Sequence, residues 1–120
     1  FTWNWIGIYG MRFYTLDDKN NPVPCSLDEW GRYFKHDSKE DKRRVAEDRI
    51  GEYHISTVFL GMDHNFFEVG PPLVFETMVF KDDDYGCAIY ENHYSTWNEA
   101  VEGHKKAVQW VKDECKNGQK

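Results

Sequence analysis

The sequence lacks several features that would assign it to a large functional class. Its three cysteines are widely spaced and form no Cys-x-x-Cys pair, which is typical of unpaired thiols in a reducing compartment. No apolar run approaches the roughly 18 residues that a membrane-spanning helix requires. The formal net charge is −6 and basic residues are interleaved with acidic ones, so a phosphate-tracking nucleic-acid surface is not expected.

Catalytic and metal-binding motifs are missing as well. The sequence has no Gly-x-Ser-x-Gly, no Walker loop and no Gly-x-Gly-x-x-Gly motif. The acidic run Asp82–Asp84 lacks the glycine and ligand spacing of a calcium loop, so we expect an exposed turn there. No histidine, cysteine or carboxylate pair has the close spacing of a metal motif. The sequence therefore predicts neither a metal nor a cofactor.

What the chain does have is length for one domain and many aromatic residues. At 120 residues, with 17% aromatics, it can fill a compact core with few large side chains. Met11 is followed directly by a strand-like segment, so we expect Phe1–Gly10 to be an upstream or added extension. This extension has no basic region or cleavage pattern, so we do not expect it to be a signal peptide. Residues 11–120 are expected to form a single α+β domain.

Apolar runs that are rich in β-branched and aromatic residues, and bounded by glycine or proline, predict the strands. Gly51 marks a hairpin between two of them. A weak alternation in the second arm suggests that both faces of that strand are covered. The expected strands are Arg12–Leu16, Arg44–Ile50, Glu52–Leu60, Leu73–Phe80 and Cys87–Tyr94.

Between the first strand and the hairpin we expect a turn and a short helix. Residues 17–24 are rich in Asp, Asn and Pro, which favour turns. Ser26 and Glu29 then form a capping box, in which each side chain caps a backbone N–H at the helix start. Leu27, Trp30 and Phe34 recur at helical spacing and are expected to form its apolar face.

A long helix is expected to close the chain. Thr96 and Glu99 form a second capping box, and apolar side chains then follow at alternating spacings of four and three. This stripe consists of Trp97, Val101, His104, Val108, Val111 and Cys115. The predicted fold is therefore α+β, with an antiparallel meander of four or five strands, a short N-terminal helix and a long C-terminal helix packed on one sheet face.

Three long motifs carry a resemblance to a known family. They are Ser56–Phe66 (STVFLGMDHNF), Pro71–Phe80 (PPLVFETMVF) and Tyr94–His104 (YSTWNEAVEGH). Together they resemble a widespread family of small proteins encoded by bacteriophages and prophages, over nearly all of residues 11–111. The resemblance implies a phage origin and a role in the host-cell cytoplasm during infection. It implies no particular reaction.

Polar residues at the predicted inner strands are the candidate ligand-binding residues. Asp63 and His64 follow a strand, where a carboxylate can orient an imidazole for proton transfer or ligand binding. Alternatively, Asp63 caps a turn and His64 is exposed. Glu76 lies within an apolar strand and needs a partner, either a ligand or a cation such as Arg44 or Arg49.

Two further histidines complete the candidate set. His104 interrupts the apolar stripe of the long helix, and a lone histidine on such a face is usually a hydrogen-bonded core residue. The alternative is that it faces a pocket near Glu76. His93, on the last strand, could line the same pocket.

These observations leave three functional hypotheses. The first is a phage accessory protein, of host-takeover or anti-defence type, that binds a host protein or a small metabolite or nucleotide. The second is a small acid–base enzyme that uses His64 or His104 with Glu76. The third is a homo-oligomeric structural module. Nucleic acid and membranes are not expected as partners.

Overall fold

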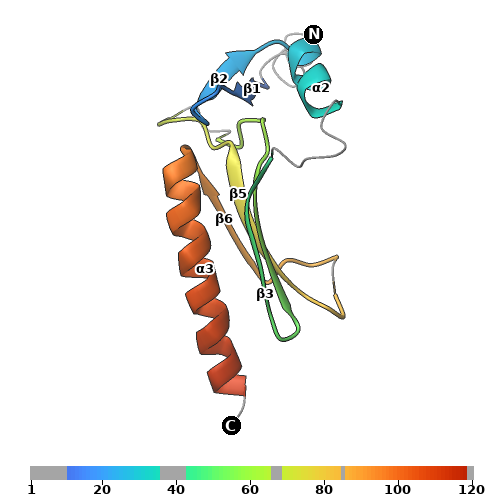
Figure 1. Ribbon diagram of the computed structural model, residues 1–120, viewed down its shortest axis with the longest axis vertical. Helices are drawn as coiled ribbons and strands as arrows, with labels where there is room; N and C mark the ends of the chain where they lie inside the picture. Colours follow the sequence, from blue (N-terminus) through green and yellow to red (C-terminus); the bar gives the residue numbers. More distant parts are fainter. Residues whose placement is uncertain (1–10, 36–42, 66–68, 85, 119–120) are drawn as a thin grey trace.

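A four-stranded antiparallel sheet and one long helix form the body of the protein (Figure 1). The architecture comes from a computed structural model, which describes residues 11–35, 43–65, 69–84 and 86–118. The sheet has the meander order β3-β4-β5-β6, and a separate two-stranded sheet pairs β1 with β2. The elements are β1 (Phe13–Leu16), β2 (Pro22–Cys25), α2 (Leu27–Lys35), β3 (Arg44–Ile50), β4 (Tyr53–Phe59), β5 (Phe75–Lys81), β6 (Tyr90–Tyr94) and α3 (Trp97–Gly118).

Both helices begin at the capping boxes that the sequence predicts. The Glu29 amide donates to Ser26 Oγ over 3.1 Å, and the Ser26 amide donates to the Glu29 carboxylate over 3.0 Å. Thr96 and Glu99 exchange the equivalent bonds, at 3.0 and 3.1 Å, before α3. Each box satisfies backbone donors that have no partner within the helix, which fixes where the helix starts.

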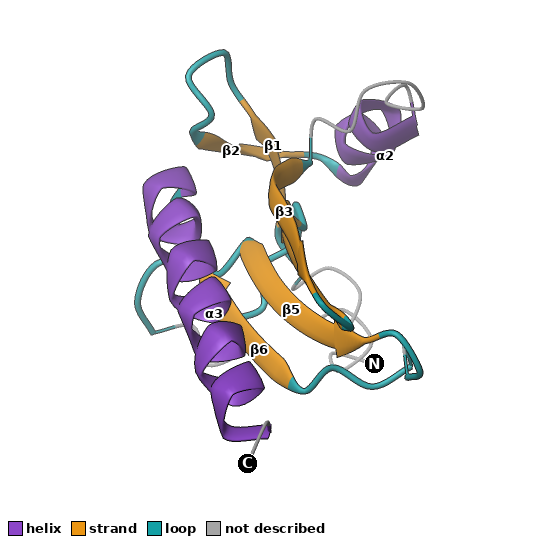
Figure 2. Cartoon of the chain, turned by 60° about the horizontal axis from the view of Figure 1, so that its bottom comes forward, coloured by secondary structure: helices purple, strands orange, loops and turns teal. Residues whose placement is uncertain are grey.

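The sheet has two different faces, because successive side chains on a strand alternate in direction. The covered face packs against α3, which contacts all four strands (Figure 2). Its side chains on β4 and β5 are buried. The open face lies on the other side, and none of the described helices packs on it. Its side chains on β4 are only half-buried, so the prediction of two covered faces holds for one face alone. The covered face consists of Tyr53, Ile55, Thr57, Phe59, Phe75, Thr77 and Val79, and the open face of His54, Ser56, Val58, Glu76, Met78 and Phe80.

Two apolar clusters fill the space beneath α3, with a polar layer between them. One cluster is built around Phe59, Phe75 and Ala100, and the other around Ile55 and Val111. The polar layer consists of Asp48, Thr57, Thr77 and His104, of which all but Asp48 are buried. His104 on α3 meets its hydrogen-bond partners on the strands in only one position of the helix along the sheet. This layer therefore fixes the register of α3.

The N-terminal elements form a small lobe at one end of the sheet (Figure 1). The expected turn is shorter than predicted and ends at Asn21, because Pro22–Cys25 pairs with Phe13–Leu16 as β2. Prolines are tolerated there since an edge strand leaves part of its backbone unpaired. Leu27 was expected on the apolar face of α2 but is 60% exposed. Trp30 and Phe34 carry that face instead, with ring centroids 4.8 Å apart.

Gly61 lets this lobe approach the sheet closely. Its φ of +73° favours glycine, and a Cβ at this position would lie 2.5 Å from Trp30 Nε1. The Gly61 carbonyl also accepts a hydrogen bond from the Tyr14 amide over 2.8 Å. The chain after β4 therefore joins the lobe to the sheet.

The cysteines, the absence of a membrane span and the N-terminal extension were also predicted from the sequence. The three cysteines are all unpaired. Within the described residues, no helix combines the length and apolar character that crossing a membrane requires. The predicted extension Phe1–Gly10 lies outside the described residues.

Candidate ligand-binding site

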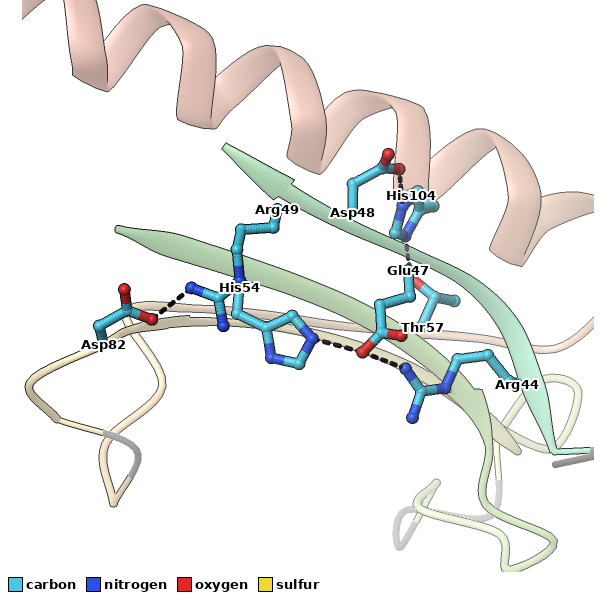
Figure 3. Close-up of polar contacts among 8 residues, drawn as sticks. All are labelled: Arg44, Glu47, Asp48, Arg49, His54, Thr57, Asp82 and His104. Atoms are coloured by element: carbon cyan, nitrogen blue, oxygen red, sulfur yellow. Dashed lines mark hydrogen bonds and ion pairs between the residues drawn. The ribbon is translucent and has the colours of Figure 1, made fainter. Parts of the chain in front are cut away.

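His104 lies at the centre of a hydrogen-bonded chain between α3 and the sheet (Figure 3). Its Nε2 is 2.8 Å from Asp48 Oδ2 and its Nδ1 is 2.7 Å from Thr57 Oγ1. The Thr57 hydroxyl in turn lies 2.5 Å from that of Thr77. A carboxylate is only an acceptor, so Nε2 carries the proton that bonds Asp48. The sequence analysis predicted none of these hydrogen-bond partners of His104, because they are distant in sequence. Asp48, for example, is 56 residues from His104.

This arrangement of carboxylate, imidazole and hydroxyl resembles an acid–base triad, yet burial gives it a structural role. The Thr57 hydroxyl would be the nucleophile, but Thr57 is fully buried and His104 is 4% exposed. A substrate atom must come within about 3 Å of such a hydroxyl, and the packed helix excludes it. His104 is therefore a core residue with both nitrogens bonded, as the commoner interpretation of the sequence held.

Tyr94 closes the same interface from β6. A Cβ on Gly103 would lie 2.1 Å from its ring, so glycine is required where the ring crosses α3. Burial raises the pKa of the Tyr94 phenol above its ordinary value of 10.0. This residue was not among the sequence candidates, although the neighbouring His93 was.

Glu76 and His93 meet on the open face. They are paired across β5 and β6, and Glu76 Oε2 lies 2.9 Å from His93 Nε2. The partner of Glu76 is thus His93, and the expected ion pair with Arg44 or Arg49 is wrong. The proposed neighbourhood of His104 and Glu76 is also wrong, because Glu76 and the adjacent Thr77 point to opposite faces and His104 shares the face of Thr77.

His64 joins this group from the loop after β4. Its ring stacks on that of His93 with centroids 5.2 Å apart and an angle of 19° between the planes. Its Nδ1 lies 3.0 Å from the Met62 carbonyl oxygen, which only accepts, so Nδ1 carries a proton. His64 is half-buried, so the predicted alternative of an exposed side chain is wrong.

Asp63 has the capping role that the sequence analysis offered as an alternative. Its Oδ1 accepts hydrogen bonds from the Asn65 amide over 2.8 Å and from the Leu73 amide over 2.9 Å. Asn65 continues the arrangement by donating to the Val69 carbonyl over 2.6 Å. Asp63 therefore holds the two ends of the loop together and does not orient His64.

Charged side chains at the β3 edge of the open face form a second group (Figure 3). Glu47 contacts Arg44 over 2.6 Å and also accepts from His54 Nε2. The hydrogen bonds from His54 and then Arg44 lower the pKa of the Glu47 carboxyl below its ordinary value of 4.5. Arg49 pairs with Asp82, in the turn that follows β5.

A hollow of about 520 Å³ lies where the N-terminal lobe meets the sheet. Its lining comes from the β1–β2 turn, α2, the start of β3 and the start of α3. The predicted candidates Asp63, His64, Glu76, His93 and His104 are not among the residues that line it. The lining consists of Leu16, Asp17, Asp18, Asn20, Tyr33, Arg44 and Trp97.

The turn that forms one wall of the hollow is rigidly held. Asp17 Oδ1 accepts from the Lys19 and Asn21 amides over 2.9 and 2.8 Å, and these bonds to backbone amides lower its pKa. Asn20 has a φ of +64°, which asparagine tolerates better than most residues. The Asp-Asn composition of this stretch predicted the turn but not the hollow.

Comparisons with protein-family models, with curated proteins and with solved structures give no match for this chain.

Proposed function

We propose that this chain is a small accessory protein that acts by binding a nucleotide or a related anionic metabolite in the hollow at the start of β3. The observation that carries the proposal is the composition of the hollow, whose lining includes Tyr33, Trp97 and Arg44. Aromatic rings stack on flat ligands, and a guanidinium matches phosphate and carboxylate oxygens.

The size and position of the hollow support the proposal. Small-molecule sites commonly have volumes of about 300–1,000 Å³ and lie where structural units meet. The present one joins the lobe to the sheet, so a ligand there would contact both. Arg44 Nη1 contacts Glu47 on the open face, so the guanidinium would have to turn away from that carboxylate to bind an anion in the hollow.

The biological setting follows from the sequence resemblance. A chain of the phage family described above would act in the cytoplasm of an infected host cell, in a host-takeover or anti-defence role. Binding an abundant small molecule is one way for a small protein to perform such a role, and binding a host protein is the alternative.

Ligand screening by thermal unfolding, followed by calorimetry, tests this proposal. We expect at least one nucleotide or phosphorylated metabolite to raise the melting temperature, since a ligand that binds only the folded state stabilises it. Arg44→Gln and Tyr33→Leu should each weaken binding by about tenfold or more.

Arg49→Gln is the matched control, because Arg49 also lies on β3 but pairs with Asp82 away from the hollow. The proposal would fail if no compound in the panel bound more tightly than about 1 mM. It would also fail if the Arg44 and Arg49 variants lost equal affinity, which would indicate a nonspecific charge effect.

Acid–base catalysis is the second candidate, and the contact of Glu76 with His93 beside His64 favours it. Those groups are half-buried, so a substrate could reach them from one side. Turnover of a hydrolase or isomerase substrate by the wild type that His64→Gln abolishes would support this function.

Light scattering at several protein concentrations tests the third hypothesis, a homo-oligomeric module, which predicts a defined mass above that of the monomer.

A further inference from the structure

Three potential metal ligands converge on the open face, away from the hollow. The ligand atoms of Glu76, Glu91 and His93 all lie within 4.8 Å of one another. Glu91 and His93 are two residues apart on β6 and so share a face, and Glu76 faces His93 from β5. The two strands run side by side in Figure 2. The pairing register, which the sequence does not reveal, creates this group.

We propose that Glu76, Glu91 and His93 bind a divalent transition-metal ion of the zinc and cobalt class. One imidazole and two carboxylates are ligands that these ions accept, and the two negative charges balance the dication. Magnesium and calcium prefer sites made entirely of oxygen ligands, so the imidazole selects against them.

The distances agree with a small coordination sphere. With bonds of about 2.0–2.2 Å, the ligand atoms around a tetrahedral ion lie roughly 3.3–3.6 Å apart. His93 Nε2 is 2.9 Å from Glu76 Oε2 and 3.9 Å from Glu91 Oε1, values on either side of that range. Small side-chain rotations would bring all three atoms onto one ion.

The burial of the three side chains favours an ion that keeps one coordination position open to water. The side chains of Glu76 and His93 are 13% and 22% exposed, whereas that of Glu91 is 50% exposed. An ion held there would be shielded by the sheet on one side and would meet water on the other. The stacked ring of His64 restricts the rotation of His93, which is the positioning that ligating histidines usually receive from a neighbour.

The competing interpretation is a plain ion pair between His93 and the two glutamates. Metal titration distinguishes the two, because a plain ion pair takes up no ion, whereas the proposed site takes up one per chain. The untagged full chain, treated with EDTA and then dialysed, would be titrated with Zn²⁺ by calorimetry. Co²⁺ would be followed by visible absorption.

We expect one ion per chain and a cobalt spectrum typical of low coordination number. His93→Gln should lower the affinity on the order of 100-fold, and Glu91→Gln by about tenfold or more. Glu91 is half-exposed, so its variant keeps the test valid even if His93→Gln folds poorly.

His54→Gln is the matched control. His54 also lies on the open face and also bonds a glutamate, Glu47. Among the described residues, however, His54 does not belong to a group of three potential metal ligands. Its variant should bind zinc like the wild type. Absence of binding at millimolar zinc would overturn the proposal, and so would an equal loss of affinity in the His54 and His93 variants.

This proposal stands apart from the proposed function. The metal ligands do not line the hollow, so nucleotide binding is measured in EDTA and zinc binding without nucleotide. Either result can fail while the other holds.

Discussion

The two faces of the four-stranded sheet each carry a histidine bonded to a carboxylate at nearly the same distance. On the covered face, His104 Nε2 lies 2.8 Å from Asp48, and on the open face, His93 Nε2 lies 2.9 Å from Glu76. Under α3, the second ring nitrogen of His104 is bonded to Thr57 and the ring is buried. On the open face, a second carboxylate lies within 3.9 Å of the same nitrogen of His93.

The difference shows that a histidine–carboxylate pair has no role of its own. Its role depends on whether a third group can reach the same atoms. The polar layer is complete, so it can only position the helix. The open-face pair has a second carboxylate beside it and a side that meets water, so a third partner can reach it.

Removing each histidine should separate the two faces most clearly. His104→Ala leaves a cavity beneath α3 and removes one partner of the Thr57 hydroxyl, so we expect it to lower the free energy of unfolding by about 3 kcal/mol. His93→Ala removes a half-buried ion pair and should cost less than about 1 kcal/mol. Urea unfolding of both variants measures this, and equal losses would show that the two pairs are energetically alike.

Crowding the covered face should also destabilise the protein. In Gly103→Ala, the new methyl would overlap the Tyr94 ring and force α3 away from β6, at a cost of about 2 kcal/mol. Gly31→Ala is the matched control, since a Cβ at Gly31 meets nothing within 4 Å. Alanine there should stabilise α2 by up to about 1 kcal/mol. Thermal unfolding compares the two, and a neutral Gly103→Ala would contradict the close packing.

Deleting a single hydroxyl tests whether the polar layer acts through its hydrogen bonds. Thr57→Val keeps the shape of the side chain but leaves His104 Nδ1 without its partner, so we expect a loss of about 1–2 kcal/mol. Ser56→Ala, one residue earlier and on the open face, should change stability by less than about 0.5 kcal/mol. The same urea experiment measures both. Equal effects would mean that the layer adds no specificity.

Acid should act on the open face through Glu47. Its pKa is lowered in the folded protein by His54 and Arg44, so the carboxylate stabilises the fold above its ordinary pKa of 4.5. That contribution is lost as the pH falls through the lower, folded-state pKa. Glu47→Gln should therefore make stability decline less steeply below about pH 5. Unfolding curves at a series of pH values measure the slope, and an unchanged slope would refute the role of Glu47.

Much of the fold could be predicted because its signals are local. The capping boxes at Ser26 and Thr96, the hairpin glycine Gly51 and the apolar stripe of α3 each depend on residues close in sequence. Together these signals predict an α+β meander with one long helix, and the structure confirms it. The error at β2 has the opposite origin, since the local preference of Pro22 for a turn was overridden by pairing with β1.

The site was less predictable, because its contacts depend on register. The residue types were informative, and Glu76 indeed required a partner. Which partner it found was set by the alignment of β5 with β6 across an intervening loop, and no residue spacing encodes that alignment. The same holds for Asp48 and His104. The hollow was missed because its walls come from four segments that share no motif.

The threonine pair beneath α3 has a further consequence. A hydroxyl can turn, so the chain of bonds through Thr57 and Thr77 can run in either direction. Thr57 can therefore bridge His104 and Thr77 whichever way the two bonds point. Through this single hydroxyl, α3 is joined to both inner strands of the sheet.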